Sequence, residues 1–356
     1  MPRIRNAPRL VAVLVSAALL FTATACGGGS DSGTPGPTGS GSRAAASGSS
    51  AFPVTIRHKH GSTTITSEPK RIVTVGLTDQ DAVLALGKVP VGTTEWLGGY
   101  KGAIGPWAQD ELAGGDIPEV LTDTGTGPQV ERIAALKPDL ILAVYGGLTR
   151  EQYASLSAFA PVVAQPKEYN DYGIPWQEQT KAIGRAIGRE AEAVKAVEST
   201  ESGIAAAAQE NPGLENASAV MATPYEGMFV FGTQDSRSRI LTGLGLTLPT
   251  GLDKAIGDRF GANISKERTD LLDQDAIVWI VGDPAKDTAK LHADPSYKNL
   301  KVVKEGREVF IDETSDYGNA TSFVSVLSLP YVIERLAPQL SAAVDGKPGT
   351  PVRPAP

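Results

Sequence analysis

Aromatic and arginine side chains gather in segments that we expect to follow strands. The aromatic residues in these segments are Trp96, Tyr100, Trp107, Tyr145, Tyr225 and Tyr317, and the arginines are Arg237, Arg239 and Arg259. In open α/β sheets, ligands bind beyond the carboxyl ends of the strands. Aromatic rings offer apolar walls with polar tips, and guanidinium groups donate paired hydrogen bonds to oxygen anions. The set therefore predicts a pocket for a bulky anionic ligand.

Each of these residues also has a plainer interpretation. A single aromatic side chain commonly belongs to the core, and an ion pair on its own helix face is the alternative for Arg239. Arg237 comes directly before an expected helix, where backbone N–H groups also favour anions. We therefore expect the residues to form a pocket because they occur as a set.

Histidines and catalytic motifs give little support for a metal site or an enzyme. The three histidines are His58 and His60, on an expected N-terminal strand, and the isolated His292. We expect His58 and His60 to be solvated, and no metal to be held by side chains. The motifs Gly-x-Ser-x-Gly, His-Glu-x-x-His and Gly-x-x-x-x-Gly-Lys-Ser/Thr are absent from the sequence. We expect no enzymatic activity and no intrinsic cofactor, and any ATP would be hydrolysed by a partner.

The N-terminus has the pattern of an export signal. Arg3, Arg5 and Arg9 precede an apolar run at 10–21, which is too short to span a bilayer permanently. Small residues then lead to Cys26, the only cysteine of the chain, in a stretch that resembles a bacterial lipobox. We expect Cys26 to be lipidated and to anchor the exported protein to the outer face of the cell membrane. A free thiol within a secretion signal is the alternative.

Composition excludes some partners and marks flexible segments. The net charge is −7, and removal of the signal would make it more negative, so binding to nucleic acid is not expected. Residues 27–50 consist almost entirely of Gly, Ser, Thr, Pro and Ala, which is typical of a flexible tether. The proline-rich end at 346–356 predicts a disordered tail.

An internal repeat indicates two similar α/β lobes. Segments 130–142 and 266–278 lie 136 residues apart, and each predicts a short helix, a turn and a buried parallel strand. Short strands alternate with helices elsewhere, which favours mainly parallel central sheets. We expect a signal peptide at 1–25, a lipid-anchored tether at 26–50, an N-terminal lobe at 51–170, an interlobe helix at 171–209, a C-terminal lobe at 210–345 and a tail at 346–356.

The segment between the lobes predicts a stiff connector. Ile183, Ile187, Ala191 and Val194 fall on one face of a helix expected from about 172 to 209. This single long helix has a possible break near Ser199 or Gly203. Because a helical connector is stiff, we expect lobe closure to be small.

Three segments resemble a known family. Residues 69–73, 85–92 and 130–142 are similar to the N-lobe signatures of the class III periplasmic binding proteins, the helical-backbone carriers of iron siderophores, haem and cobalamin. The resemblance extends over 52–345. It implies a substrate-binding lipoprotein that delivers a ferric siderophore, held in the cleft between the lobes, to an ABC permease dimer with a cytoplasmic ATPase.

The resemblance also implies docking residues and leaves alternatives open. By motif position, Glu131 and Glu267 correspond to the acids that dock onto permease arginines in this family. The alternative for each glutamate is a favourable position in the first turn of a helix, worth about 0.3–1 kcal/mol. Haem bound through a tyrosine, cobalamin, and a sensing or scaffold role without transport are the other candidate functions.

Overall fold

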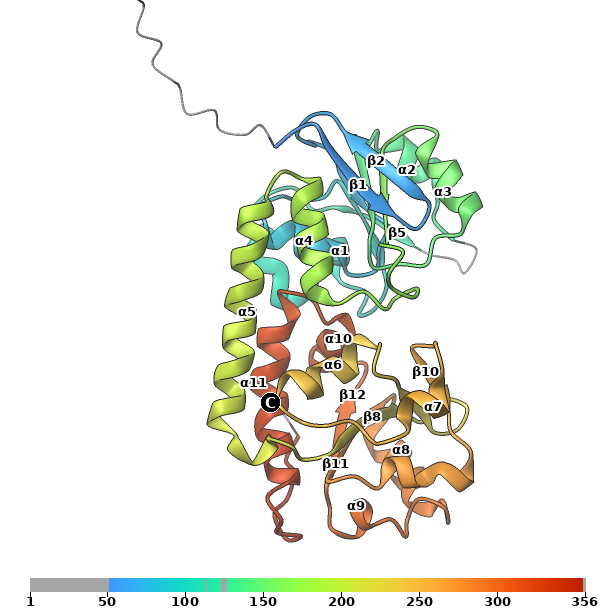
Figure 1. Cartoon of the computed structure of the whole chain (residues 1–356), viewed down its shortest axis with the longest axis vertical. Coiled ribbons are helices and arrows are strands. Elements are labelled where there is room, and N and C mark those ends of the chain that lie inside the picture. Colours follow the sequence, from blue (N-terminus) through green and yellow to red (C-terminus); the bar gives the residue numbers. More distant parts are fainter. Residues whose placement is uncertain (1–50, 113, 123–126, 355–356) are drawn as a thin grey trace, which may run out of the picture. The chain divides into compact units, whose positions relative to one another are not determined.

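A computed structural model describes residues 51–112, 114–122 and 127–354, which form two α/β lobes (Figure 1). The expected signal peptide and tether, including Cys26, lie outside the described residues. Within the described ranges, no helix is long and apolar enough to cross a membrane.

The N-terminal lobe is built on five parallel strands. Their order across the sheet is β5-β4-β3-β6-β7, and every neighbouring pair is parallel. A hairpin of β1 (Val54–His58) and β2 (Gly61–Ile65) precedes the sheet. The sheet strands are β3 (Ile72–Thr74), β4 (Gly92–Glu95), β5 (Glu119–Thr122), β6 (Leu140–Ala143) and β7 (Val162–Ala164).

The C-terminal lobe repeats this strand order as β10-β9-β8-β11-β12. Its central strands β8, β11 and β12 are parallel, whereas β9 and β10 are joined by antiparallel pairings. The strands are β8 (Ala219–Thr223), β9 (Phe229–Phe231), β10 (Gly261–Asn263), β11 (Ala276–Val281) and β12 (Glu308–Asp312). The predicted fold class, two α/β lobes with mainly parallel sheets, is confirmed.

Helices cover the sheets and connect the lobes (Figure 1). The N-terminal lobe contains α1 (Asp79–Ala85), η1 (Lys101–Ala103), η2 (Pro106–Leu112), α2 (Val130–Ala135), α3 (Arg150–Ser157) and α4 (Trp176–Ala186). The long helix α5 (Glu190–Glu210) follows. The C-terminal lobe contains η3 (Pro212–Leu214), α6 (Ser236–Gly243), α7 (Leu252–Ile256), η4 (Lys266–Leu272), α8 (Pro284–Ala293), α9 (Lys301–Lys304), α10 (Asp316–Phe323) and α11 (Ser328–Ala343).

Each sheet is buried on both faces, as the continuous apolar strands predict. Successive side chains of β11 alternate between two clusters: Val278 and Ile280 join one, and Ile277 and Trp279 join the other. The strand β6 divides its residues in the same way between the two clusters of the N-terminal lobe. The central strand of each lobe therefore connects two layers of core.

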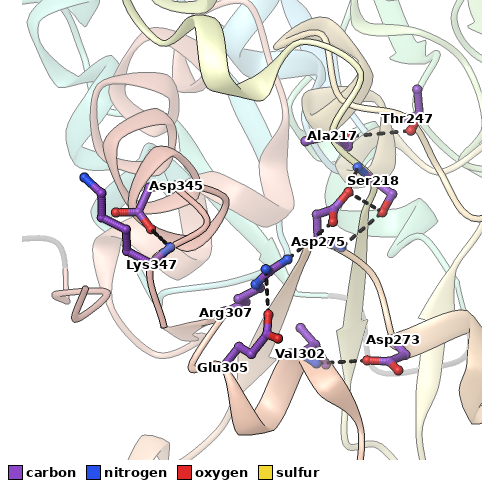
Figure 2. A network of polar contacts seen from close by, with 10 residues as sticks. All are labelled: Ala217, Ser218, Thr247, Asp273, Asp275, Val302, Glu305, Arg307, Asp345 and Lys347. Atoms are coloured by element: carbon purple, nitrogen blue, oxygen red, sulfur yellow. Dashed lines mark hydrogen bonds and ion pairs between the residues drawn. The ribbon is translucent and has the colours of Figure 1, made fainter. Parts of the chain in front are cut away.

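The repeated segments place an aspartate at the same point in both lobes. Asp139 accepts hydrogen bonds from the backbone N–H groups of Lys70 and Arg71, at 2.9 and 2.8 Å, just before β3. Asp275 accepts from the backbone N–H of Ser218, at 2.9 Å, just before β8 (Figure 2). Each carboxylate thus satisfies N–H groups at the start of the neighbouring strand and fixes its register. Each copy of the repeat was predicted to begin with a short helix. The first copy forms the α-helix α2, whereas the second forms the 3₁₀ helix η4.

In the C-terminal lobe, an arginine also contacts the aspartate of the repeat. Arg307 lies between two acids, with Nη1 3.3 Å from the carboxylate of Asp275 and Nη2 2.6 Å from that of Glu305 (Figure 2). The pKa of Asp275 is held below its usual range. The main cause is the hydrogen bond from the Ser218 backbone N–H, and the Ser218 hydroxyl and Arg307 add smaller effects. Asp273 accepts from the backbone N–H of Val302 and fixes the start of α9.

The connector differs from the predicted single helix over 171–209. It consists of α4 and α5, which pack side by side and are separated at 187–189, where Gly188 adopts a φ of +71° (Figure 1). The left-handed conformation of Gly188 ends α4, because it favours glycine over residues with a side chain. Ile183 and Ile187 are buried as predicted, but the restart changes the helical phase, so that Val194 is 36% exposed and Val197 is buried.

The C-terminal segment also differs from its prediction. Residues 346–354 contain no helix or strand, yet they fold back onto the C-terminal lobe. Gln339 of α11 donates from Nε2 to the carbonyl oxygen of Arg353 at 2.9 Å, and Val352 packs against a core cluster. The expectation of a disordered tail is therefore wrong for these residues.

Candidate ligand-binding site

A cavity of about 400 Å³ lies where the carboxyl ends of strands from both lobes meet. The N-terminal lobe contributes Trp96, Leu97 and Gly98, which follow β4 directly. The C-terminal lobe contributes residues at or just after the ends of β8, β9, β11 and β12, in the first turn of α6 and on α10, namely Thr223, Phe231, Arg237, Ile280, Glu313, Thr314, Asn319 and Ser322. This position is where ligands bind in open α/β sheets.

Hydrogen bonds between the lobes surround this region. Tyr100 donates its hydroxyl proton to Asp316 Oδ1 at 2.7 Å and accepts from Asn319 Nδ2 at 3.1 Å. The hydroxyl groups of Tyr145 and Ser236 are 3.3 Å apart. Burial, together with the bond to Asp316, raises the pKa of Tyr100, so its phenol stays protonated and can donate.

A third interlobe contact involves the segment before α4. Asn170 Nδ2 donates to Gln234 Oε1 at 2.9 Å and to the carbonyl oxygen of Asp258 at 2.6 Å. Arg239 Nη1 donates to the carbonyl oxygen of Gly173 at 2.9 Å. The two lobes are therefore held together by polar contacts from several segments that are distant in sequence.

Aromatic rings form a continuous layer between the lobes. The ring of Phe323 on α10 lies 5.4 Å from Trp96 and 5.0 Å from Trp107, measured between centroids. Trp107 also makes an edge contact with Tyr100 at 5.8 Å, and Trp96 lies 6.4 Å from Tyr145. Gly98, with a φ of +81°, permits the sharp turn after Trp96, and a side chain there would meet the Tyr100 ring.

Arg237 faces the cavity as part of a preformed ion pair. Its Nε and Nη2 atoms donate to Oδ1 and Oδ2 of Asp235, both at 2.8 Å, and its guanidinium lies 3.8 Å from the centroid of the Phe231 ring. Burial lowers the pKa of Arg237, but the charge and hydrogen bonds of Asp235, together with Tyr145, raise it by more in total. The guanidinium therefore stays charged, and its charge is offset by that of Asp235.

A buried carboxylate positions the strand end next to Tyr145. Asp79, in the first turn of α1, accepts from the backbone N–H groups of Val144 and Tyr145 at 2.7 and 2.9 Å. It also accepts from Gln179 Nε2 of α4 at 2.8 Å. Burial raises the pKa of Asp79, and these three hydrogen bonds oppose that rise. Asp79 thus joins α1, the end of β6 and α4.

A second buried carboxylate on α1 joins the two lobes. Asp81 Oδ2 accepts from the Ser325 hydroxyl at 2.5 Å and from Trp107 Nε1 at 2.8 Å. Ser325 lies between α10 and α11 in the C-terminal lobe, whereas Trp107 belongs to η2 in the N-terminal lobe. Burial raises the pKa of Asp81 to about 6, against the opposing effect of the two hydrogen bonds.

The predicted site residues divide into several groups. Trp96 and Arg237 line the cavity, whereas Tyr100 and Tyr145 bridge the lobes and Trp107 lies in the aromatic layer. The remaining four lie elsewhere: Arg239 bonds Gly173, Arg259 is exposed and donates to the Ile256 carbonyl, Tyr225 is 64% exposed, and Tyr317 is buried with its hydroxyl donating to Gln339.

Some lining residues were not among the predicted site residues. Asn319 and Ser322 are three residues apart on α10, so they share a helix face directed at the cavity. Glu313 follows β12, and Phe231 ends β9. A position directly after a strand was the sequence feature that could have identified a lining residue. Glu313 has this position after β12, as Trp96 has it after β4.

A second cavity, of about 490 Å³, lies away from the strand ends. It is lined by residues of α4, α5 and α6, including Trp176, Glu201 and Arg239. Because few groups at strand ends reach it, its position does not match that of ligand sites in α/β folds. The cavity at the strand ends is therefore the candidate site.

Glutamates of the repeat lie on the surface. Glu131 is exposed in the first turn of α2, and Glu267 is exposed in the first turn of η4. A hydrogen bond from the Ser265 hydroxyl holds the pKa of Glu267 below its usual range. Both carboxyl groups are therefore accessible from solvent.

Among the described residues, no group of three or more His, Cys, Asp and Glu side chains could hold a metal ion. The expectation that His58 is solvated is wrong, because it is buried and its Nε2 lies 3.0 Å from the Thr63 hydroxyl. Burial lowers the pKa of His58, and so does the neighbouring His60.

The chain is similar in sequence and in fold to proteins that are already known. A family model described as periplasmic binding protein matches residues 72–314. The structure of a periplasmic solute binding protein from Mycobacterium smegmatis is 34% identical and covers 82% of this chain and 98% of its own, with a TM-score of 0.70. The structure of PiaA from Streptococcus pneumoniae in complex with ferrichrome is 27% identical and covers 82% and 98%, with a TM-score of 0.73.

A curated relative is also similar in sequence. The Fe(3+) dicitrate-binding periplasmic protein FecB of Escherichia coli is 29% identical over 216 residues, which are 57% of this chain. The match spans 65% of that protein, slightly less than two thirds of its length.

Asp81 should make stability depend on pH. An aspartate whose folded-state pKa is about 6, against 3.8 for the ordinary group, contributes stability that is fully present below pH 3.8 and is lost as pH rises through 6. Relative to D81N, the wild-type chain should gain about 1 kcal/mol in free energy of unfolding when pH falls from 7 to 5. Denaturant titrations of both proteins at the two pH values measure this difference. A difference that does not change with pH would contradict the assignment.

Proposed function

This chain belongs to the periplasmic binding protein family, and on that basis we propose that it carries a ferric siderophore and delivers it to an ABC permease. The membership confirms the resemblance noted in the sequence. The observation that carries the proposal is the cavity of about 400 Å³ at the strand ends, walled by Trp96 and Phe231. Its size and its apolar walls with a few polar groups suit a small-molecule ligand.

The chemistry of the lining indicates how iron would be held. Thr223, Thr314, Asn319 and Ser322 offer neutral hydrogen-bonding groups, and Arg237 offers a cationic donor. Glu313 is the one carboxylate among the described lining residues, and no group of three metal-binding side chains surrounds it, so the iron would enter inside a chelator. PiaA, which has this fold, is solved with ferrichrome. Since no tyrosine is among the described residues of the lining, haem held by an axial tyrosine has no support there.

Delivery would use the exposed glutamates of the two lobes. Glu131 and Glu267 occupy matching positions of the repeat, and both are solvent-exposed. We propose that each meets an arginine of the permease dimer, whose cytoplasmic ATPase would supply the energy. A first-turn glutamate also interacts favourably with the helix dipole, but that interaction does not require a match between lobes.

Attachment to the membrane would use Cys26. The charged start, short apolar run and small residues before this cysteine have the pattern of a lipoprotein signal. We propose that the mature protein begins at lipidated Cys26 and works outside the cell membrane.

Binding can be tested by tryptophan fluorescence. A ferric siderophore in the proposed cavity should quench the emission of Trp96, so W96F should lose most of the quenching. The matched control is W176F, because Trp176 lines the other cavity and its loss should leave most of the quenching in place. A panel of ferric siderophores, haem and cobalamin identifies the ligand. Quenching that disappears in W176F, or tight binding of haem alone, would contradict the proposal.

Docking can be tested by charge reversal. The double variant E131K/E267K should reduce uptake of the iron chelate at least several-fold in a deletion strain, because two attractive contacts become repulsive. Its affinity for the chelate should not change. E198K, which reverses an exposed charge on α5, serves as the control and should retain normal uptake. Normal uptake by the double variant would rule out docking by these acids.

Lipidation can be tested by metabolic labelling. The wild-type protein should incorporate a labelled fatty acid and fractionate with membranes, whereas C26A should remain unlabelled. Because Cys26 is the only cysteine, no other thiol can take the label. An unlabelled wild-type protein would show that Cys26 is not an anchor.

A further inference from the structure

The charges around the cavity do not favour an anion. Arg237 is the only cationic side chain among the described residues of the lining, and Glu313 is an acidic one. Within the part of the chain that the structure describes, Glu313 forms no ion pair. Arg239 and Arg259, on which the expectation of an anionic ligand also rested, do not line this cavity.

The charge of Arg237 is already matched by an acid. Asp235 is 1% exposed and receives two guanidinium hydrogen bonds, so the pair brings no net charge to the cavity. The two bonds use Nε and Nη2, and Nη1 remains as a donor for an uncharged oxygen. Asp235 is also the N-cap of α6, since Oδ1 accepts from the backbone N–H of Arg237 at 2.8 Å. Capping requires only one carboxylate oxygen, whereas the guanidinium also occupies Oδ2.

A further acid lies beside the lining. Asp316 accepts from Tyr100, whose hydroxyl also receives the bond from the lining residue Asn319. Among the described lining residues and Asp316, with the Asp235–Arg237 pair counted as neutral, the formal charge comes from Glu313 and Asp316, and both are negative. Arg239 also interacts with Asp235, but it lies outside the lining. An anionic chelate would lose its hydration and meet this charge, and both changes disfavour binding.

We propose that the cargo is an uncharged or cationic ferric chelate of the hydroxamate type, rather than an anionic carboxylate chelate. The inference rests on the proposed function and specifies its ligand. Three hydroxamates each lose one proton and balance the three charges of ferric iron. Citrate carries carboxylates in excess of that balance, so its ferric complex is anionic. The neutral oxygens of a hydroxamate chelate would accept from Arg237 and Asn319, and its apolar parts would lie against Trp96 and Phe231.

The test compares two probes with the full chain. Ferrichrome, a trihydroxamate chelate, and ferric dicitrate are titrated separately and their dissociation constants are compared. The wild-type protein should bind ferrichrome at least about tenfold more tightly than ferric dicitrate. Equal or tighter binding of ferric dicitrate would overturn this inference while leaving the proposed function in place. Failure to bind any ferric chelate in a siderophore panel would instead overturn the proposed function, and this inference with it.

Two charge-removing variants test the cause of the selectivity. D235N keeps a good N-cap residue, and E313Q changes an exposed side chain that is not part of the ion pair, so a folding defect in one does not affect the other. Each should raise the affinity for ferric dicitrate several-fold relative to that for ferrichrome, because the removed negative charge opposes only the anionic probe. E198Q removes the same charge from α5 outside the lining and should change neither affinity. Variants that bind both probes as the wild-type protein does would overturn the electrostatic explanation.

Discussion

Removing the hydrogen-bond partners of a buried carboxyl group destabilises the folded state considerably, and Asp81 takes its partners from both lobes. The Ser325 hydroxyl and the Trp107 indole donate to the same oxygen. Separation of the lobes at this point would leave Asp81 without its C-terminal partner. Ser325 closely follows α10, and α10 contributes lining residues to the cavity. The position of this side of the cavity therefore depends on the hydrogen bond between Ser325 and Asp81, which lies outside the lining.

The aromatic layer extends this dependence toward the ligand site. Trp107, fixed by Asp81, packs against Phe323, and Phe323 packs in turn against Trp96, which lines the cavity. On the other side of α1, Asp79 holds the backbone that carries Tyr145. Two acids of one short helix thus position groups from both lobes around one space. The helix α1 therefore positions residues around the site, although none of its own residues is among those that line the cavity.

The sequence was informative about strands and less informative about side-chain direction. The repeat predicted two equivalent lobes, and the shared strand order confirms them, because a continuous apolar run specifies a buried strand in either lobe. The direction of the side chains on α10 depends on the phase of a short helix, and no sequence pattern indicates that phase. Tyr317 consequently turns into the core toward Gln339, while Asn319 and Ser322 reach the cavity. The connector shows the same difficulty, since one left-handed glycine, Gly188, separates α4 from α5 and changes which residues of α5 face the core.

The clamp on Arg237 has a consequence for the thermodynamics of ligand binding. A free arginine side chain loses about 2 kcal/mol of rotamer entropy when it is fixed by a ligand, and that loss weakens the complex. Here the guanidinium is held by Asp235 and lies over Phe231 before any ligand arrives. The ordering of this side chain is thus part of folding, and it does not have to be repeated each time the carrier is loaded and emptied.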